Sequence, residues 1–236
     1  MSKFKKLTII LFSFLIIEFL IILSNYFNNI ESFKDVNIEG YKPGKPIVIL
    51  VNIPSNELAV FQNGNLIKTY TVASGKPSTP SPIGTWKIIS KGTWGEGFGG
   101  RWMGFNVPWG KYGIHGTNKP NSIGWNSSHG CIRMKNEDVA ELYKITPYGT
   151  QVIIYGGPYG NFGSYLRILK PGMRGSDVYE VQRLLKYKGY YKANPDGIYG
   201  DYMKNIVHKF QKENKLPISD TVSYSFYKKL GVILMD

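Results

Sequence analysis

The spacing of apolar residues changes once along this chain, and that change divides it into two folded parts. In the first part they form short, β-branched runs such as 47–53, which indicate buried strands. In the last seventy or so residues they recur every three or four positions, which is the spacing of a helix face. The stretch 156–164 between them is rich in Gly and predicts a linker. We expect a domain of strands at 46–155 and a small helical domain at 165–236.

The first domain carries further signals of strands. Asn63-Gly64 separates two strand-like runs and predicts a tight hairpin, because both central residues of that turn need positive φ. Further strands are expected at 85–90 and 151–155, and one short helix is expected to be capped near Asn136. The fold class predicted for this domain is mainly β, a sandwich or barrel.

The second domain is expected to be a small all-α unit of three helices. Ser176 or Asp177 should cap the first helix, and the second should start at Asp201. The three apolar faces are Val178, Val181, Leu184 and Leu185, then Met203, Ile206, Val207 and Phe210, and last Phe226, Tyr227 and Leu230.

The N-terminus predicts a membrane anchor. Three lysines precede an apolar run at 7–23, whose helix would be roughly 25 Å long at ~1.5 Å per residue. The lysines place the N-terminus in the cytoplasm, so 1–24 is expected to be a single-pass anchor. A linker at 25–45 would then lead to a catalytic part that faces the cell wall. A cleaved signal peptide is the alternative, but no small-x-small cleavage site follows the run.

The charge of the chain restricts its partners. Lys and Arg number 29 against 16 acidic residues, a formal charge of +13. Outside a membrane, such a chain meets anionic wall polymers and lipid head groups, and no nucleic-acid recognition motif is present. Ordinary solubility is the alternative reason for the charge. A single cysteine excludes an internal disulfide and a multi-cysteine metal site.

That cysteine, Cys131, lies within seventeen residues of two of the three histidines, His115 and His129. An unpaired thiol in an exported protein is a buried small residue, an oxidation site or a nucleophile, and a nucleophile needs a nearby base. Either histidine can serve. Gly130 lets the backbone turn, so that its amide and that of Cys131 can form an oxyanion hole. The alternative is a zinc site with His115, His129 and Cys131 as ligands.

The residues around the cysteine form a long ordered motif, His115-Gly-Thr followed by Ser128-His-Gly-Cys-Ile-Arg-Met134. This motif resembles the signature of the L,D-transpeptidases of peptidoglycan, which have a YkuD-type catalytic domain. The resemblance extends over roughly 47–155 and includes the Asn63-Gly64 hairpin and the closing strand.

The resemblance implies roles for individual residues. Cys131 would be the nucleophile, His115 the imidazole that activates it, and the carbonyl of Gly116 the group that orients the ring. The residues that would shape the site are Ser128, His129, Gly130 and Arg133. For Arg133, the alternative role is an ion pair that holds the loop.

The resemblance also implies a reaction that needs no metal or organic cofactor. Cys131 would attack a tetrapeptide stem, release the terminal D-alanine and form a thioester. The amine of an acceptor stem would then resolve it as a 3→3 cross-link, with His115 moving the protons. The alternatives are an L,D-carboxypeptidase, in which water replaces the acceptor, and a wall-binding protein without activity. Four tryptophans are candidates to line the cleft, and at least two of them are expected in the core instead: Trp94, Trp102, Trp109 and Trp125.

The helical domain resembles the three-helix peptidoglycan-binding domain. The matching segments include Asp196-Gly-Ile-Tyr-Gly200, whereas Tyr202-Met203 replaces the usual threonine and Ile218-Ser-Asp220 replaces a second Asp-Gly. The resemblance implies peptidoglycan as the partner of this domain. His208 is expected to be a solvated helix residue.

Overall fold

The computed structural model of the chain describes residues 38–232. The anchor predicted at 1–24 lies outside the described residues. Among the residues that are described, no helix has the length and apolar character needed to cross a bilayer. The chain divides into two compact units, Met1–Gly44 and Lys45–Asp236. All strands and helices of residues 38–232 lie in the second unit.

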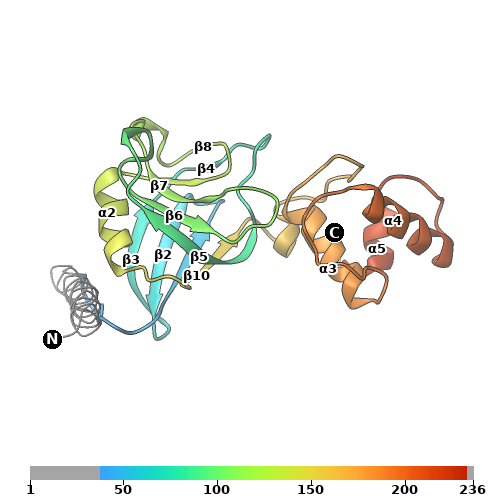
Figure 1. Cartoon of the computed structure of the whole chain (residues 1–236), viewed down its shortest axis with the longest axis horizontal. Coiled ribbons are helices and arrows are strands. Elements are labelled where there is room, and N and C mark those ends of the chain that lie inside the picture. Colours follow the sequence, from blue (N-terminus) through green and yellow to red (C-terminus); the bar gives the residue numbers. More distant parts are fainter. Residues whose placement is uncertain (1–37, 233–236) are drawn as a thin grey trace, which may run out of the picture. The chain divides into compact units, whose positions relative to one another are not determined.

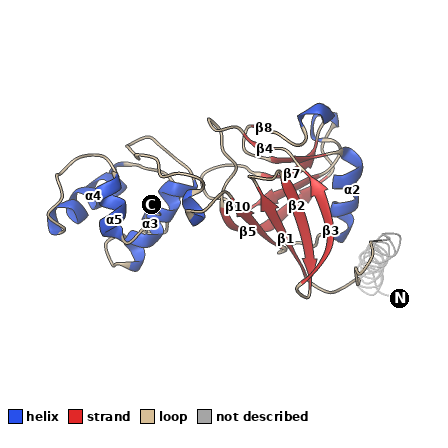
Figure 2. Ribbon diagram, turned by 180° about the vertical axis from the view of Figure 1, so that it is seen from behind, coloured by secondary structure: helices blue, strands red, loops and turns tan. Residues whose placement is uncertain are grey.

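Eight strands of the second unit form one sheet in the order β3-β2-β1-β10-β5-β6-β7-β9, and β4 and β8 form a separate two-stranded ladder (Figure 2). Their bounds are β1 (Ile47–Asn52), β2 (Glu57–Gln62), β3 (Asn65–Thr71), β4 (Ser74–Gly75), β5 (Gly84–Gly92), β6 (Trp102–Phe105), β7 (Gly113–Gly116), β8 (Asn126–Ser128), β9 (Ile132–Met134) and β10 (Gln151–Tyr155).

A backbone bridge joins the two edges of the sheet. Ala73, which follows the first strand in the order, exchanges two hydrogen bonds with Arg133 in the last strand. Their N···O distances are 2.8 and 2.9 Å. Because the bridge pairs both edges, the domain is barrel-like, which confirms the expectation of a mainly β domain and selects the barrel over the sandwich.

The individual strand predictions agree with the structure. Asn63 and Gly64 have φ of 51° and 80° and join β2 to β3, as the hairpin requires. The strand expected at 85–90 is longer and becomes β5. The closing strand β10 runs parallel to β1 and antiparallel to β5 in the middle of the sheet. The core between these strands is apolar and fully buried, as at Ile49, Val51, Leu58 and Ile114.

Helix α2 (Asn136–Ile145) lies beside β3 (Figure 1), where Tyr70 donates a 3.0 Å hydrogen bond to Glu141. The helix begins where expected, but Asn136 does not cap it: Lys135 occupies the N-cap position and no side chain caps the helix. The Asn136 amide oxygen instead accepts a hydrogen bond from the backbone of Thr117 at 2.9 Å. The side chain therefore stabilises the loop after β7.

The C-terminal module contains α3 (Ser176–Tyr187), α4 (Asp201–Glu213) and α5 (Tyr224–Leu230), shown in orange to red in Figure 1. These are the three predicted helices, and α4 starts at the predicted residue. The expectation for the first cap was wrong. Gly175 occupies that position, and the Asp177 carboxylate accepts two hydrogen bonds from Arg167 instead. The fully buried core is Leu169, Val178, Val181, Leu185, Val207, Val222, Phe226 and Tyr227.

His208 on α4 is half-exposed, and its Nε2 lies 2.7 Å from a carboxylate oxygen of Asp220. The expected helix position is therefore correct, but the ring has a hydrogen-bond partner in Asp220, from the segment that follows the helix.

Candidate active site

Strand pairing brings Cys131 to His115. Strands β7 and β9 are parallel neighbours in which Ile114 pairs with Ile132 and His115 with Arg133. Cys131 directly precedes β9 and so lies level with Gly113, whose backbone amide donates a hydrogen bond to the thiol sulfur. Since side chains alternate along strands, Cys131, Arg133 and His115 share one face. Two residues sixteen positions apart thus lie on neighbouring strands with their side chains on the same face, and Cys131 is partly exposed.

The His115 ring is oriented by the backbone. Its Nδ1 lies 2.6 Å from the carbonyl oxygen of Gly116, which is the contact that the resemblance implies. A carbonyl oxygen only accepts, so Nδ1 carries the proton and donates it. Nε2 of the neutral ring is therefore left with its lone pair, the arrangement that a proton acceptor requires.

Two aromatic rings hold the imidazole from the sides. Phe98 makes an edge contact with His115 at a centroid distance of 5.0 Å, and Trp102 lies over it at 5.8 Å. Trp94 in turn stacks on Trp102 at a centroid distance of 4.7 Å. His115 is only 5% exposed, so these rings exclude water from most of it.

A pair of glycines allows the loop that carries Phe98 to approach β7. This loop contains the short 3-10 helix η1 (Glu96–Phe98). A Cβ on Gly99 would lie 2.6 Å from Cα of Gly116 and would also collide with Oδ1 of Asn136. Gly99 has φ +58°, which favours glycine as well. The backbone contact is therefore possible only without side chains.

Hydrogen bonds fix the turn before the cysteine. The buried Ser128 hydroxyl donates to the carbonyl of Cys131 at 2.6 Å and accepts from the amide of Gly130 at 3.0 Å. Gly130 has φ +112°, and a Cβ there would lie 2.6 Å from the ring of Tyr112. The amide of Gly130 is engaged within the turn, so among the two candidate oxyanion donors only that of Cys131 is not committed to Ser128.

Burial sets the charge state of the pair. It raises the pKa of the Cys131 thiol, and the Gly113 amide and the positive charge of Arg133 act in the opposite direction. Burial also lowers the pKa of His115; the Gly116 carbonyl opposes this shift, and Arg133 adds to it. The resting pair is therefore a neutral thiol beside a neutral imidazole.

The other candidate site residues differ in their exposure to solvent. His129 is exposed, whereas His115 is buried. Within residues 38–232 no group of three or more His, Cys, Asp or Glu side chains could hold a metal ion, so the proposed zinc ligands do not form a set. Arg133 is partly buried, and its charge acts on both Cys131 and His115.

Of the four tryptophans, Trp102 and Trp109 are buried, as expected for two of them, while Trp94 and Trp125 are 43% and 69% exposed.

The sequence analysis did not place Phe98, Tyr112 or Asn136 at the site. Phe98 stands midway between Trp94 and Trp102 at four-residue intervals, which is the signal that could have identified it.

Comparison with known proteins shows which families the chain matches. Residues 46–154 match the family described as "L,D-transpeptidase catalytic domain", and residues 174–222 match "Putative peptidoglycan binding domain". The curated proteins named "Putative L,D-transpeptidase YkuD" from Bacillus licheniformis and Bacillus subtilis are 43% and 44% identical over 110 residues, which are 46% of this chain. "Putative L,D-transpeptidase YqjB" from Bacillus subtilis is 39% identical over 128 residues, which are 48% of this chain.

The chain spans 66% of the length of the first two relatives and 72% of the third. The matched segment contains the paired strands that carry His115 and Cys131. The chain therefore belongs to the L,D-transpeptidase family and combines its catalytic domain with a C-terminal module of the peptidoglycan-binding type.

Proposed function

We propose that this chain cross-links peptidoglycan stem peptides as a cysteine L,D-transpeptidase, through a thioester on Cys131. The observation that carries the proposal is the orientation of His115. Its Nδ1 proton is donated to the carbonyl of Gly116, and the opposite nitrogen remains basic on the face that bears the thiol. A base beside a lone thiol is the arrangement for nucleophilic acyl transfer.

In the first half-reaction, the sulfur attacks the carbonyl of the third stem residue while Nε2 of His115 takes the thiol proton. The amide of Cys131 donates to the resulting oxyanion. The imidazolium then gives its proton to the departing amine of the terminal D-alanine. The C–N bond breaks, and an S–acyl bond remains.

In the second half-reaction, His115 takes a proton from the amine of an acceptor stem as that amine attacks the thioester. The new amide is a 3→3 cross-link, and the thiolate leaves and regains the proton. Phe98 and Trp102 exclude water from the imidazole, which favours an amine over water as the acceptor.

The proposal includes the location of the enzyme. The apolar run at 7–23 after three lysines supports a single-pass anchor with the catalytic domain on the wall side of the membrane. The formal charge of +13 suits a surface of anionic polymers.

The test uses the full chain in detergent and the masses of its products. With a carbapenem, which acylates nucleophiles, the intact mass is expected to increase by one adduct, and Cys131→Ala should abolish the increase. His115→Ala should slow adduct formation by about 10²–10⁴-fold, the usual contribution of a positioned base. His208→Ala, a histidine of the C-terminal module, is the matched control and should react normally.

Incubation with disaccharide-tetrapeptides then identifies the acceptor. Cross-linked dimers support the proposal, whereas tripeptides alone would show that water is the acceptor and that the chain is a carboxypeptidase. An adduct that persists in Cys131→Ala would contradict the assignment of the nucleophile. A wild-type chain that forms neither adduct nor product would be a binding protein.

A further inference from the structure

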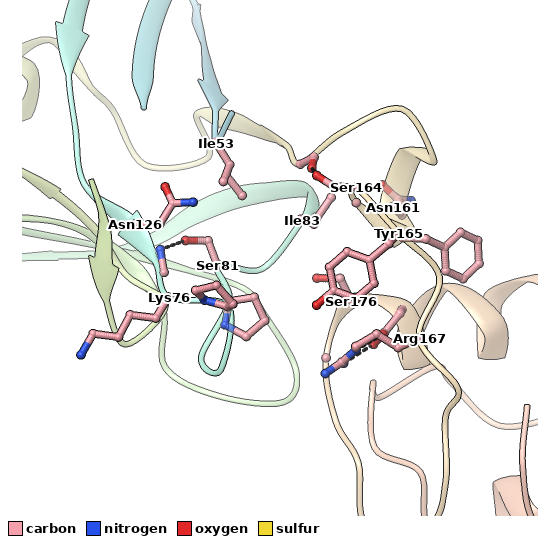
Figure 3. A pocket seen from close by; sticks show the side chains of 18 residues that line it. Ile53, Lys76, Ser81, Ile83, Asn126, Asn161, Ser164, Tyr165, Arg167 and Ser176 are labelled. Carbon is pink, nitrogen blue, oxygen red and sulfur yellow. Dashed lines mark hydrogen bonds and ion pairs between the residues drawn. The ribbon is translucent and has the colours of Figure 1, made fainter. Parts of the chain in front are cut away.

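A pocket of about 240 Å³ lies where the catalytic domain meets the segment that leads into the C-terminal module. It is separate from the Cys131–His115 pair, neither of which lines it. Figure 3 shows the lining residues on the two sides of the pocket, with the Lys76 side chain pointing away from it. One wall carries Lys76, Ser81 and Asn126, and the other carries Tyr165, Arg167 and Ser176.

Aromatic packing holds the two walls together. The ring of Tyr179 on α3 lies 5.7 Å from Trp86 and 5.5 Å from Trp109, both from the catalytic domain. Gly197 packs so closely on Trp109 that a Cβ there would lie 2.9 Å from Cδ2. Trp86 and Trp109 are 4% and 5% exposed. The pocket is therefore bounded by packed surfaces and exists before any ligand arrives.

Because the exposed Lys76 side chain points away from the pocket, the groups that face it favour an uncharged polar ligand. The Asp177 carboxylate accepts two hydrogen bonds from Arg167, at 2.6 and 2.9 Å, and its charge offsets that of the guanidinium, which weakens the attraction of the pocket for an anion. The hydroxyls of Ser176 and Tyr165 make no hydrogen bond to any residue in 38–232. Asn126 uses its amide oxygen to accept from Ser74, which leaves its NH₂ group to donate.

Tyr165 adds an apolar surface to these polar groups. Its side chain is 59% exposed although it lines the pocket. An aromatic face next to hydroxyl and amide groups suits a ligand with an apolar face and a polar edge, which is the character of a sugar ring with its axial C–H groups and its hydroxyls.

A short series of hydrogen bonds connects the wall of the pocket to the residues around Cys131. Gly75, which lines the pocket, pairs with Ser128, and the amide of Lys76 donates to the carbonyl of Ser128 at 3.0 Å. Ser128 in turn bonds the carbonyl of Cys131. The wall of the pocket is therefore hydrogen-bonded to the turn that carries the thiol.

We propose that this pocket binds a hexosamine ring of the peptidoglycan strand whose stem peptide reaches Cys131. The inference rests on the proposed function, since it identifies the saccharide as part of the same substrate. The catalytic domain and the C-terminal module then form one substrate site, in which the sugar fixes the position of the stem.

The test measures binding rather than turnover and uses the full chain with Cys131→Ala. The two probes are a disaccharide-tetrapeptide and the same tetrapeptide without sugar, titrated by calorimetry. We expect the disaccharide-tetrapeptide to bind about tenfold more tightly. This is the order of magnitude of the affinity that one stacked ring and its hydrogen bonds contribute. Tyr165→Ala and Ser176→Ala, each combined with Cys131→Ala, should bring the ratio of the two affinities close to one. Tyr187→Ala is the matched control, because Tyr187 is 88% exposed on α3 and does not line the pocket.

Two results would overturn the inference: equal affinity for both probes, or a ratio that Tyr165→Ala and Ser176→Ala leave unchanged, which would place the sugar elsewhere. Melting curves of the variants exclude unfolding as the cause of a lost ratio. Failure of the proposed function would look different from failure of this inference. In that case the wild-type thiol would not be acylated, but the ratio of the two affinities would persist.

Discussion

Replacing Gly99 by alanine should slow acylation of Cys131 in addition to destabilising the fold. Gly99 has φ +58°, a conformation that costs an alanine about 1–2 kcal/mol. The added Cβ would also lie 2.6 Å from Cα of Gly116, whereas ordinary contact begins at 3.4 Å. The two backbones must therefore separate by roughly 0.8 Å, the difference between these distances.

That separation displaces the groups that hold the imidazole. The Gly116 carbonyl orients Nδ1 of His115, and Phe98 in the adjacent loop contacts the ring. Since a misplacement of about 1 Å can lower a rate by ~10²-fold, we expect acylation to slow by roughly ten- to a hundredfold. The assay is the rate of carbapenem adduct formation by intact mass, with melting temperature measured in parallel.

Gly100→Ala is the matched control. Gly100 also has positive φ, at +73°, but a Cβ there would meet nothing within 4 Å. It should lose a similar ~1–2 kcal/mol of stability and keep its acylation rate. Equal acylation rates in the two variants would refute the reasoning, because the close contact of Gly99 with Gly116 would then have no effect on the imidazole.

Two further predictions concern charge. Arg133→Gln removes a positive charge that lowers the pKa of both Cys131 and His115, so both pKa values should rise. The imidazole must be neutral to accept the thiol proton, so the acidic limb of the acylation pH profile should move to higher pH; a limb that stays in place would contradict the role of this charge. Asp177→Asn leaves Arg167 without its buried partner and should lower the stability of the chain by about 2 kcal/mol, below the ~3–5 kcal/mol of fully buried pairs because Arg167 is 31% exposed. Urea denaturation measures this loss, and an unchanged midpoint would show that the pair contributes nothing.

Local sequence determined much of the fold. The Asn63-Gly64 hairpin followed from the positive φ that both turn residues need, and the start of α4 at Asp201 followed from periodicity. The two caps were predicted wrongly for a common reason. Asn136 and Asp177 have the right chemistry for capping, but each bonds a distant group instead, the amide of Thr117 and the guanidinium of Arg167. Tertiary contacts decide which partner a polar side chain takes.

The candidate site likewise has features that the sequence predicts and features that only the tertiary structure sets. The motif around Cys131 was sufficient to identify the residues that carry the proposed chemistry, because a lone thiol beside histidines is a rare combination of residue types. By residue type alone either histidine could serve, and the resemblance of the motif selected His115; the pairing of β7 with β9 is what places His115 and Cys131 on one face. The close packing of Gly99 on Gly116 depends equally on strands and loops that are distant along the chain. Sequence fixes which groups are available, and tertiary packing fixes which of them meet, because a contact between distant segments depends on the register of every strand between them.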